Sequence, residues 1–287
     1  MNSLEIKNIT KEYGNFKLDN ISFDLPSGCI MGIIGQNGAG KSTTIKLILD
    51  MIEKDHGTVS IFGNDHKQNI QSLKEDIGVV LDDIGLPECL TAKQVGHIMK
   101  LTFKQWDEYE YNRMLSTFSI PSEKQFKEFS RGTKTKLAIA IAMSHKAKLL
   151  ILDEPTNALD PVVRDEVIEM LYDFTRNENH SILISSHIVS DLEKLCDFIV
   201  FIHDGKLLLN EEKDELLSRY GIIYCTNEQL KNIPSDAVKY KKETKYGNEV
   251  IVERAFMGND IKVSPVSIED LFLFMVKKGD NNEGAAS

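Results

Sequence analysis

A glycine-rich segment near the N-terminus has the residue types and the spacing of a phosphate-binding loop. The pattern G-x-x-x-x-G-K-[ST] is matched by the run Gly35-Gln36-Asn37-Gly38-Ala39-Gly40-Lys41-Ser42-Thr43. Glycines allow successive backbone N–H groups to turn toward phosphate oxygens, because no Cβ stands in the way. The Lys41 ammonium would reach the β- and γ-phosphates, and the Ser42 hydroxyl would ligate Mg²⁺. The segment therefore predicts a site for a nucleoside triphosphate and Mg²⁺.

The segments on either side of this loop have the patterns that such a loop requires. Residues 29–34 form a continuous apolar run, which predicts a buried strand, and residues 44–52 have helical spacing. The start of that helix would add a favourable dipole end for an anion. A chance glycine-rich turn need not lie between a strand and a helix, so the flanks favour the functional interpretation.

A second candidate for chemistry is a pair of carboxylates at the end of an apolar run. Residues 149–152 read Leu-Leu-Ile-Leu and are followed by Asp153 and Glu154. A buried strand rarely ends in two charges without a purpose, and a metal site supplies one. Asp153 would meet Mg²⁺ directly or through water. Glu154 would face the γ-phosphate and orient or deprotonate the attacking water.

The remaining patterns predict an α/β fold that positions these two segments. Residues 4–25 alternate apolar and polar side chains, as half-buried antiparallel strands do. Apolar runs at residues 77–81, 149–152, 181–184 and 198–202 are typical of strands covered by helices on both faces. Helical spacing at residues 91–103, 107–118 and 133–147 predicts a helical insert, residues 85–148, that divides a doubly wound core, residues 1–84 and 149–220.

The C-terminal part has a different character. We expect a charged helix at residues 211–220, a small accessory domain at 221–279 with strands near 222–225 and 249–253, and a disordered tail at 280–287. The spacing of Ser267 and Asp270 resembles a capping box. The helix that follows would have one apolar face, made by Ile268, Leu271, Phe272 and Met275, with Phe274 and Val276 off that face. Such a helix would be either partly buried or a contact for a second copy or a partner.

Composition limits the class of protein. The chain has 287 residues, 41% of them hydrophobic, and a formal net charge of −10, which disfavours nucleic acid as the main partner. No apolar run approaches the length of about 20 residues that spans a bilayer, and the N-terminus lacks a signal-peptide pattern. We therefore expect a cytoplasmic location. The four cysteines are scattered, so neither a disulfide framework nor a zinc site is indicated.

The order of the motifs identifies a family. Upstream of the carboxylate strand, the run Phe129-Ser130-Arg131-Gly132-Thr133 opens a helix that Ser130 could cap, and Gly132 would leave its backbone accessible to an anion. Downstream follow Asn157-Ala158-Leu159-Asp160 and Ser185-Ser186-His187. Phosphate loop, helical insert, Ser-x-Gly signature, Asp-Glu strand and this histidine occur in the order of the ATP-binding cassette (ABC) family, which the chain resembles over about residues 3–220.

The resemblance implies a role for each matching position. Tyr13 corresponds to the aromatic residue that stacks on adenine, and Gly35, Asn37, Gly38, Ala39, Gly40, Lys41, Ser42 and Thr43 would hold the phosphates. Ser130 and Gly132 match residues that contact the γ-phosphate of the opposite subunit, so catalysis would need a head-to-tail dimer, with an identical cassette or a different one. Asp160 matches the loop between the two sites. His187 would touch the γ-phosphate and hold the attacking water.

Two positions depart from the family pattern. Asp82 stands where the family usually has glutamine, and although Asp82 can still ligate Mg²⁺, it cannot donate an amide hydrogen bond. Arg131 replaces a glycine of the signature, and Thr133 replaces its final glutamine. Arg131 would either add charge near the phosphates or point to solvent.

The family resemblance implies an ATP-hydrolysing subunit that drives a separate transmembrane permease, whose cytoplasmic helix would dock near residues 82–103. The subunit would then lie peripherally on the inner face of the plasma membrane. The chain is similar to the ATPase subunits of bacterial exporters of drugs, bacteriocins or peptides. The alternative is a soluble ABC ATPase of translation or DNA maintenance, although no second cassette and no long coiled coil is evident. A GTPase switch lacks support, because no N-K-x-D motif is present.

Overall fold

A computed structural model describes residues 1–65, 73–157, 159–258 and 261–284, with side-chain surroundings up to Lys277. Within this part of the chain, ten strands form one continuous sheet in the order β5-β4-β1-β2-β10-β9-β3-β8-β7-β6. These strands are β1 (Asn2–Tyr13), β2 (Phe16–Pro26), β3 (Ile30–Ile34), β4 (His56–Ile61), β5 (Asn64–Asp65), β6 (Ile77–Val80), β7 (Leu149–Asp153), β8 (Ser181–Ser186), β9 (Phe198–His203) and β10 (Lys206–Glu212).

The sheet has an antiparallel half and a parallel half. β1 pairs antiparallel with β2 and β4, in agreement with the alternating pattern of residues 4–25. Around β3, the neighbours β8 and β9 run parallel to it, and β7 and β6 continue the parallel order. The two halves meet where β10 pairs with β2, at Lys206 and Asp19. The predicted antiparallel subdomain is therefore an extension of the core sheet.

Every residue of β3, β7 and β8 is buried. Alternate side chains enter two separate hydrophobic clusters: Ile30 and Ile34 contribute to one, while Met31 and Ile33 contribute to the other. Helix α1 (Lys41–Ile48) belongs to the second cluster, and α5 (Arg131–Met143), α6 (Pro161–Phe174) and α7 (Val189–Leu195) belong to the first. Burial on both faces explains why these strands read as continuous apolar runs.

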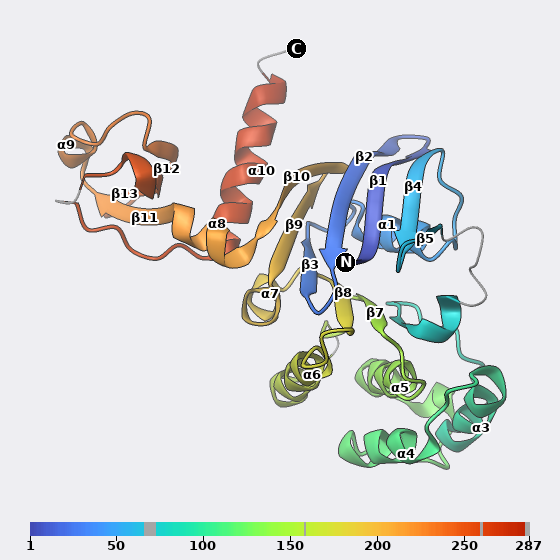
Figure 1. Ribbon diagram of the computed structural model, residues 1–287. Coiled ribbons are helices and arrows are strands. Elements are labelled where there is room, and N and C mark those ends of the chain that lie inside the picture. The colour runs from blue at the N-terminus through green and yellow to red at the C-terminus, as the bar shows by residue number, and fades with distance from the viewer. Residues whose placement is uncertain (66–72, 158, 259–260, 285–287) are drawn as a thin grey trace.

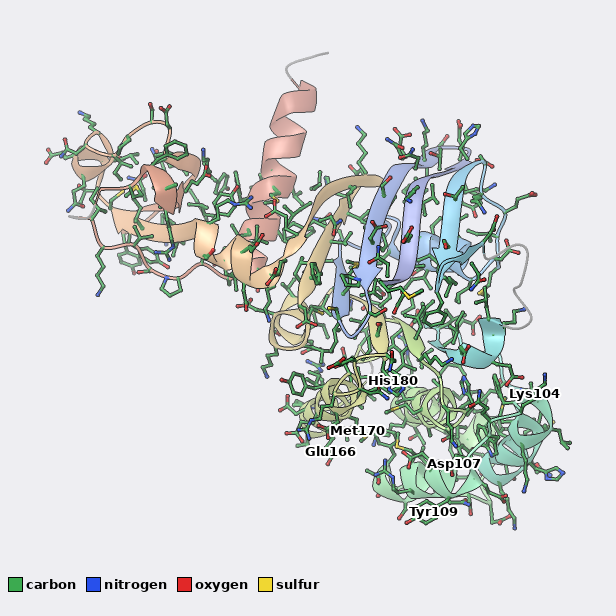
Figure 2. All side chains as sticks on the ribbon, viewed as in Figure 1. Lys104, Asp107, Tyr109, Glu166, Met170 and His180 are labelled. Carbon is green, nitrogen blue, oxygen red and sulfur yellow. The ribbon has the colours of Figure 1, made fainter. Side chains whose placement is uncertain are left out.

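The helical insert contains α3 (Ala92–Thr102), α4 (Glu108–Thr117) and α5, and it lies at the end of the sheet away from the C-terminal elements (Figure 1). Thr91 and Asp107 cap α3 and α4 through side-chain hydrogen bonds to Gln94 N and Glu110 N. Figure 2 shows Tyr109 on α4, Asp107 at the start of that helix and Lys104 just after α3. The prediction of a helix over 133–147 is correct in type, but α5 begins two residues earlier and ends at Met143.

The C-terminal part forms a second, three-stranded sheet in the order β11-β13-β12. Its elements are α8 (Lys213–Arg219), β11 (Tyr220–Cys225), α9 (Asn227–Leu230), β12 (Val238–Thr244), β13 (Gly247–Glu253) and α10 (Ile268–Gly284). Residues 211 and 212, expected to begin a helix, instead complete β10. Strand pairing with β9 overrides their helical pattern.

The last helix differs from its sequence pattern in two ways. The predicted capping box is confirmed, because Asp270 N donates to Ser267 Oγ at 3.1 Å and Ser267 N donates to Asp270 Oδ2 at 3.3 Å. Phe274 and Val276 are buried, whereas one apolar face was expected without them. Contacts on several sides of α10 account for this. The predicted disordered tail from residue 280 is also wrong as far as Gly284, where α10 ends, and residues 285–287 lie outside the described residues.

No helix in the described part of the chain is both long and apolar enough to cross a membrane.

Candidate active site

A cavity of about 600 Å³ opens where β3, β7 and β8 end. In parallel α/β sheets, ligands bind at this carboxyl edge of the strands. The phosphate loop, the carboxylate strand and the histidine after β8 all reach this cavity. It is lined by Phe16, Gln36, Asn37, Gly38, Gly40, Lys41, Ser42, Thr43, Asp82, Glu154, Asn157 and His187.

The phosphate loop has the backbone conformation that its glycines permit. Gly38 and Gly40 have φ values of 83° and 115°, which side chains other than glycine rarely adopt. Gly40 precedes α1 as its N-terminal cap residue, so the first N–H groups of the helix face the cavity. A Cβ on Gly40 would also approach Leu18 Cδ1 to 2.7 Å. The loop is therefore shaped for an anion at the start of α1.

The turn between β9 and β10 supports the loop from behind. Gly205 N donates to Ala39 O at 2.9 Å, and a Cβ on Gly35 would lie only 2.5 Å from Ile202 O. Gly35 is thus required by close packing rather than by contact with the cavity. Ala39 is buried, because the same turn packs against it.

Lys41 is the central cation of the cavity. Its Nζ donates to Gly35 O at 2.8 Å and to Gln36 O at 3.3 Å, and it lies 3.3 Å from Glu154 Oε1. The Lys41 and Glu154 side chains are 6% and 10% exposed, so this ion pair is largely removed from water. A buried charge pair of this kind needs its hydrogen-bond partners, because an unpaired charge at this depth would be costly.

Ser185 fixes the backbone of Glu154, and Lys41 and His187 contact its carboxylate. Its φ of 53° is unusual for a residue other than glycine, and its N–H donates to Ser185 O at 3.1 Å and lies 3.2 Å from Ser185 Oγ. Its Oε2 lies 2.7 Å from His187 Nδ1, so the carboxylate connects Lys41 with His187. Strained backbone of this kind concentrates at functional sites.

Asp153 lies behind the cavity. It is 3% exposed, and Ser185 Oγ donates to its Oδ1 at 2.5 Å. Of the three predicted metal-binding residues, Ser42 and Asp82 line the cavity and Asp153 does not.

Besides Gly35 and Ala39, four predicted nucleotide-contacting residues do not line this cavity: Tyr13, Ser130, Gly132 and Asp160. Tyr13 is 43% exposed with Lys11 Nζ 5.4 Å from its ring centroid, and Phe16 is the aromatic residue at the cavity. Ser130 caps α5 by accepting from Thr133 N at 3.2 Å, next to Gly132. Asp160 caps α6 by accepting from Val163 N at 3.1 Å. Ala158 lies outside the described residues.

Three lining residues, Phe16, Gln36 and Asn157, were not predicted as site residues. Gln36 lies within the phosphate loop and Asn157 in the motif that ends at Asp160, so only Phe16 had no motif that could have indicated it. Arg131, expected either near the phosphates or in solvent, is 62% exposed, and its guanidinium donates to Asp82, which lines the cavity.

Comparison with known proteins places this arrangement in a family. The family model described as ABC transporter matches residues 18–157. The lantibiotic transport ATP-binding protein SrtF of Streptococcus pyogenes is 36% identical over 214 residues, which cover 74% of this chain and 91% of that protein. The bacitracin transport ATP-binding protein BcrA of Enterococcus faecalis is 34% identical over 219 residues, which cover 75% of this chain and 71% of BcrA.

A solved structure described as the ATP binding subunit of an ABC transporter has a TM-score of 0.66 at 28% identity, covering 74% of this chain and 91% of that one. The residues matched by the family model include the phosphate loop and Glu154, and the similarities to SrtF and to the solved structure each cover about three quarters of this chain. The chain therefore belongs to the ATP-binding, ATP-hydrolysing subunits of ABC transporters.

Proposed function

We propose that this subunit hydrolyses ATP as one half of a two-cassette dimer and thereby drives a separate transmembrane permease that exports antimicrobial peptides or drugs. The observation that carries the ATPase site is the connected set Lys41, Glu154 and His187 along one cavity. The substrate class is supported by SrtF and BcrA, relatives named for lantibiotic and bacitracin transport. The soluble-ATPase alternative gains no support from these relatives.

The residues present fit ATP and Mg²⁺. The loop glycines leave room for phosphate oxygens, and the cavity volume of about 600 Å³ lies in the range of small-ligand sites. Among the described residues, no group of three or more His, Cys, Asp or Glu side chains could hold a metal alone. Mg²⁺ typically uses one or two protein ligands together with substrate phosphates. Ser42 and Asp82 at the cavity suit that mode, with Asp153 acting through water.

Bound ATP and Mg²⁺ would supply the reacting phosphate and neutralise its developing charge. Lys41 would turn its ammonium from Glu154 toward the phosphates while keeping the loop carbonyls as partners. Glu154, released from Lys41, would orient or deprotonate the attacking water. His187 Nδ1, at 2.7 Å from Glu154 Oε2, would fix the direction of that carboxylate. Phe16 or Tyr13 would stack on the base.

The proposal of a second cassette is supported by predicted nucleotide-contacting residues that do not line the cavity of their own chain. Ser130 and Gly132 begin α5 and do not line the cavity of their own chain. Their places in the signature would be explained if they completed the site of an opposite subunit, with Asp160 at the contact between the two.

A permease contact is supported by a second cavity, of about 1200 Å³, between the core and the helical insert. Its walls include apolar side chains from both parts, among them Leu81, Ile84, Leu86, Met99 and Phe103. A cytoplasmic helix of the permease would place its apolar face there. The subunit would then be peripheral on the inner face of the membrane.

The first test uses Glu154→Gln, which keeps the size of the side chain and removes its negative charge. We expect ATP affinity to remain and steady-state hydrolysis to fall by about 100-fold or more, because general-base catalysis contributes that much. Glu166→Gln is a matched control on the exposed side of α6 (Figure 2). Undiminished hydrolysis by Glu154→Gln would exclude Glu154 as the base.

The second test concerns the transported compound. In its own host, loss of this subunit should raise susceptibility to bacitracin or a lantibiotic, and Glu154→Gln should fail to restore resistance where Glu166→Gln restores it. Unchanged susceptibility to both peptides would contradict the proposed substrate class but not the ATPase assignment.

A further inference from the structure

The two positions that depart from the family pattern are in contact. Arg131 Nη2 donates to Asp82 Oδ1, although the residues are 49 positions apart in sequence. Asp82 follows β6 in the core, and Arg131 is the first residue of α5 in the helical insert. A glutamine and a glycine at these positions would form no ion pair. The exchange of both residues therefore creates a charged link between the two parts of the cassette.

Asp82 lies where two cavities adjoin. Among the described residues, it alone lines both the nucleotide cavity and a neighbouring cavity of about 490 Å³. Arg131 lines only the second of these. The Asp82 carboxylate therefore has a cationic partner on one side and, on the other, the space in which Mg²⁺ would accompany ATP.

A carboxylate in this position faces a competition that a glutamine would not. A guanidinium and Mg²⁺ are both cations that bind carboxylate oxygens, and each weakens the hold of the other through charge neutralisation and repulsion. An uncharged amide has no net charge to divide between them. The pair can thus couple metal binding at the cavity to the position of α5.

We propose that Arg131 is a positioning residue for Asp82: Arg131 holds this carboxylate toward the helical insert and competes with Mg²⁺ for it. This inference rests on the proposed function. Metal binding at Asp82 releases Arg131, and the release loosens the link between β6 and the start of α5. A charged contact thereby takes over the coupling between core and insert at the position of the family's glutamine.

The exposure of the pair sets the size of the effect. The Arg131 and Asp82 side chains are 62% and 54% exposed, and ion pairs this accessible are weak and sensitive to salt. Removing Arg131 should therefore tighten the Mg²⁺-dependent part of nucleotide binding by only about twofold to fivefold. The gain should be largest at low ionic strength.

The test measures the affinity of a non-hydrolysable ATP analogue with and without Mg²⁺ by calorimetry. The readout is the affinity in the presence of Mg²⁺ divided by the affinity in its absence. In about 50 mM salt we expect Arg131→Gln to raise this ratio about twofold to fivefold over wild type, and in about 1 M salt we expect the difference to vanish. Arg131→Lys should lie between wild type and Arg131→Gln, because its ammonium keeps the charge without the fork of donors.

A double-mutant cycle identifies Asp82 as the partner. In an Asp82→Asn background, Arg131→Gln should leave the ratio unchanged, because no carboxylate remains for which to compete. Arg113→Gln is the matched control, since Arg113 is a similarly exposed arginine of the insert that pairs with Glu110. The Arg113→Gln variant should have the same affinity ratio as wild type.

Two results would overturn the inference: an unchanged ratio for Arg131→Gln at low salt, or the same gain with and without Asp82. If the analogue does not bind, or binds equally well to Lys41→Ala, the proposed function itself fails, and that outcome is distinct from the other two.

Discussion

The nucleotide cavity and the C-terminal sheet rest on very different amounts of buried structure. Behind the cavity, every residue of β3, β7 and β8 is buried, and hydrophobic clusters cover both faces of the strands. In the C-terminal sheet, no residue of β12 is buried, and the local cluster has five buried members: Ile223, Ile233, Ala237, Val250 and Val252. A sheet of that size needs support from a neighbouring element.

Helix α10 supplies much of that support. Phe272 packs edge-on against Phe201 of β9 with ring centroids 5.3 Å apart, and Phe274 packs against Tyr240 of β12 at 5.9 Å. Glu193 of α7 accepts from Ile268 N at 3.1 Å and so holds the start of α10. The core therefore stabilises its own site, whereas the C-terminal sheet depends on α10 to connect it to the core.

The largest expected effect is at Phe272. Phe272→Ala should lower the free energy of unfolding by about 3–5 kcal/mol, because it removes a buried aromatic ring and leaves a cavity. Leu273→Ala, on the exposed side of the same helix, should change it by less than about 0.5 kcal/mol. Urea unfolding measures both. Equal losses in the two variants would show that the buried face of α10 contributes no more to stability than its exposed face.

A smaller loss is expected at Gly205, in the turn behind the phosphate loop. Its φ is 74°, and a Cβ there would overlap Lys17 O, so Gly205→Ala should cost about 2–4 kcal/mol. Nucleotide affinity should fall as well, because Gly205 N donates to Ala39 O.

Gly63→Ala is the control for Gly205, since its φ is 75° but no atom lies within 4 Å of its Cβ position. It should cost only about 1 kcal/mol and leave nucleotide affinity unchanged. If Gly205→Ala behaves like Gly63→Ala, the turn does not support the loop.

The capping box of α10 should matter less. Ser267→Ala removes the acceptor for Asp270 N and should cost about 1 kcal/mol. Hydrogen exchange should show faster opening of α10 and β12, with the amides of β3 and β7 unchanged. Equal acceleration in the core strands would mean that the two regions unfold as one unit.

The smallest effects are expected at two exposed ion pairs, one in each region. Hydrogen bonds from Lys11 and from Lys241 lower the pKa values of Asp55 and Glu243. A lowered pKa in the folded state adds stability above the unfolded pKa of about 4, and this stability is lost as pH falls through the folded pKa. Asp55→Asn and Glu243→Gln should therefore flatten the acid side of the stability profile.

Urea midpoints measured from neutral pH downward would check these two variants. Steeper acid dependence in either variant would contradict the direction of the shift.

Local patterns predicted the core strands well, because the apolar runs of β3, β7 and β8 are buried along their whole length. The phosphate loop, β3, β7, β8 and the carboxylate pair could all be recognised from the chain. The helices α6 and α7 were not predicted, although they cover one face of the same sheet. The sequence led to Tyr13 as the stacking aromatic residue, whereas Phe16 lines the cavity, because which aromatic residue reaches the cavity depends on how the β1–β2 hairpin meets the loop.

Residue types and spacing by themselves predicted a nucleoside triphosphate site with Lys41 and Ser42 as its phosphate and metal contacts and Glu154 beside them, because those requirements are local to a few consecutive residues. Tertiary structure alone decided that Lys41 and His187 converge on Glu154, that Arg131 pairs with Asp82, and that α10 buries Phe274. The reason is physical: these contacts join segments far apart in the chain, and only the packing of the sheet and its helices sets the distance between them.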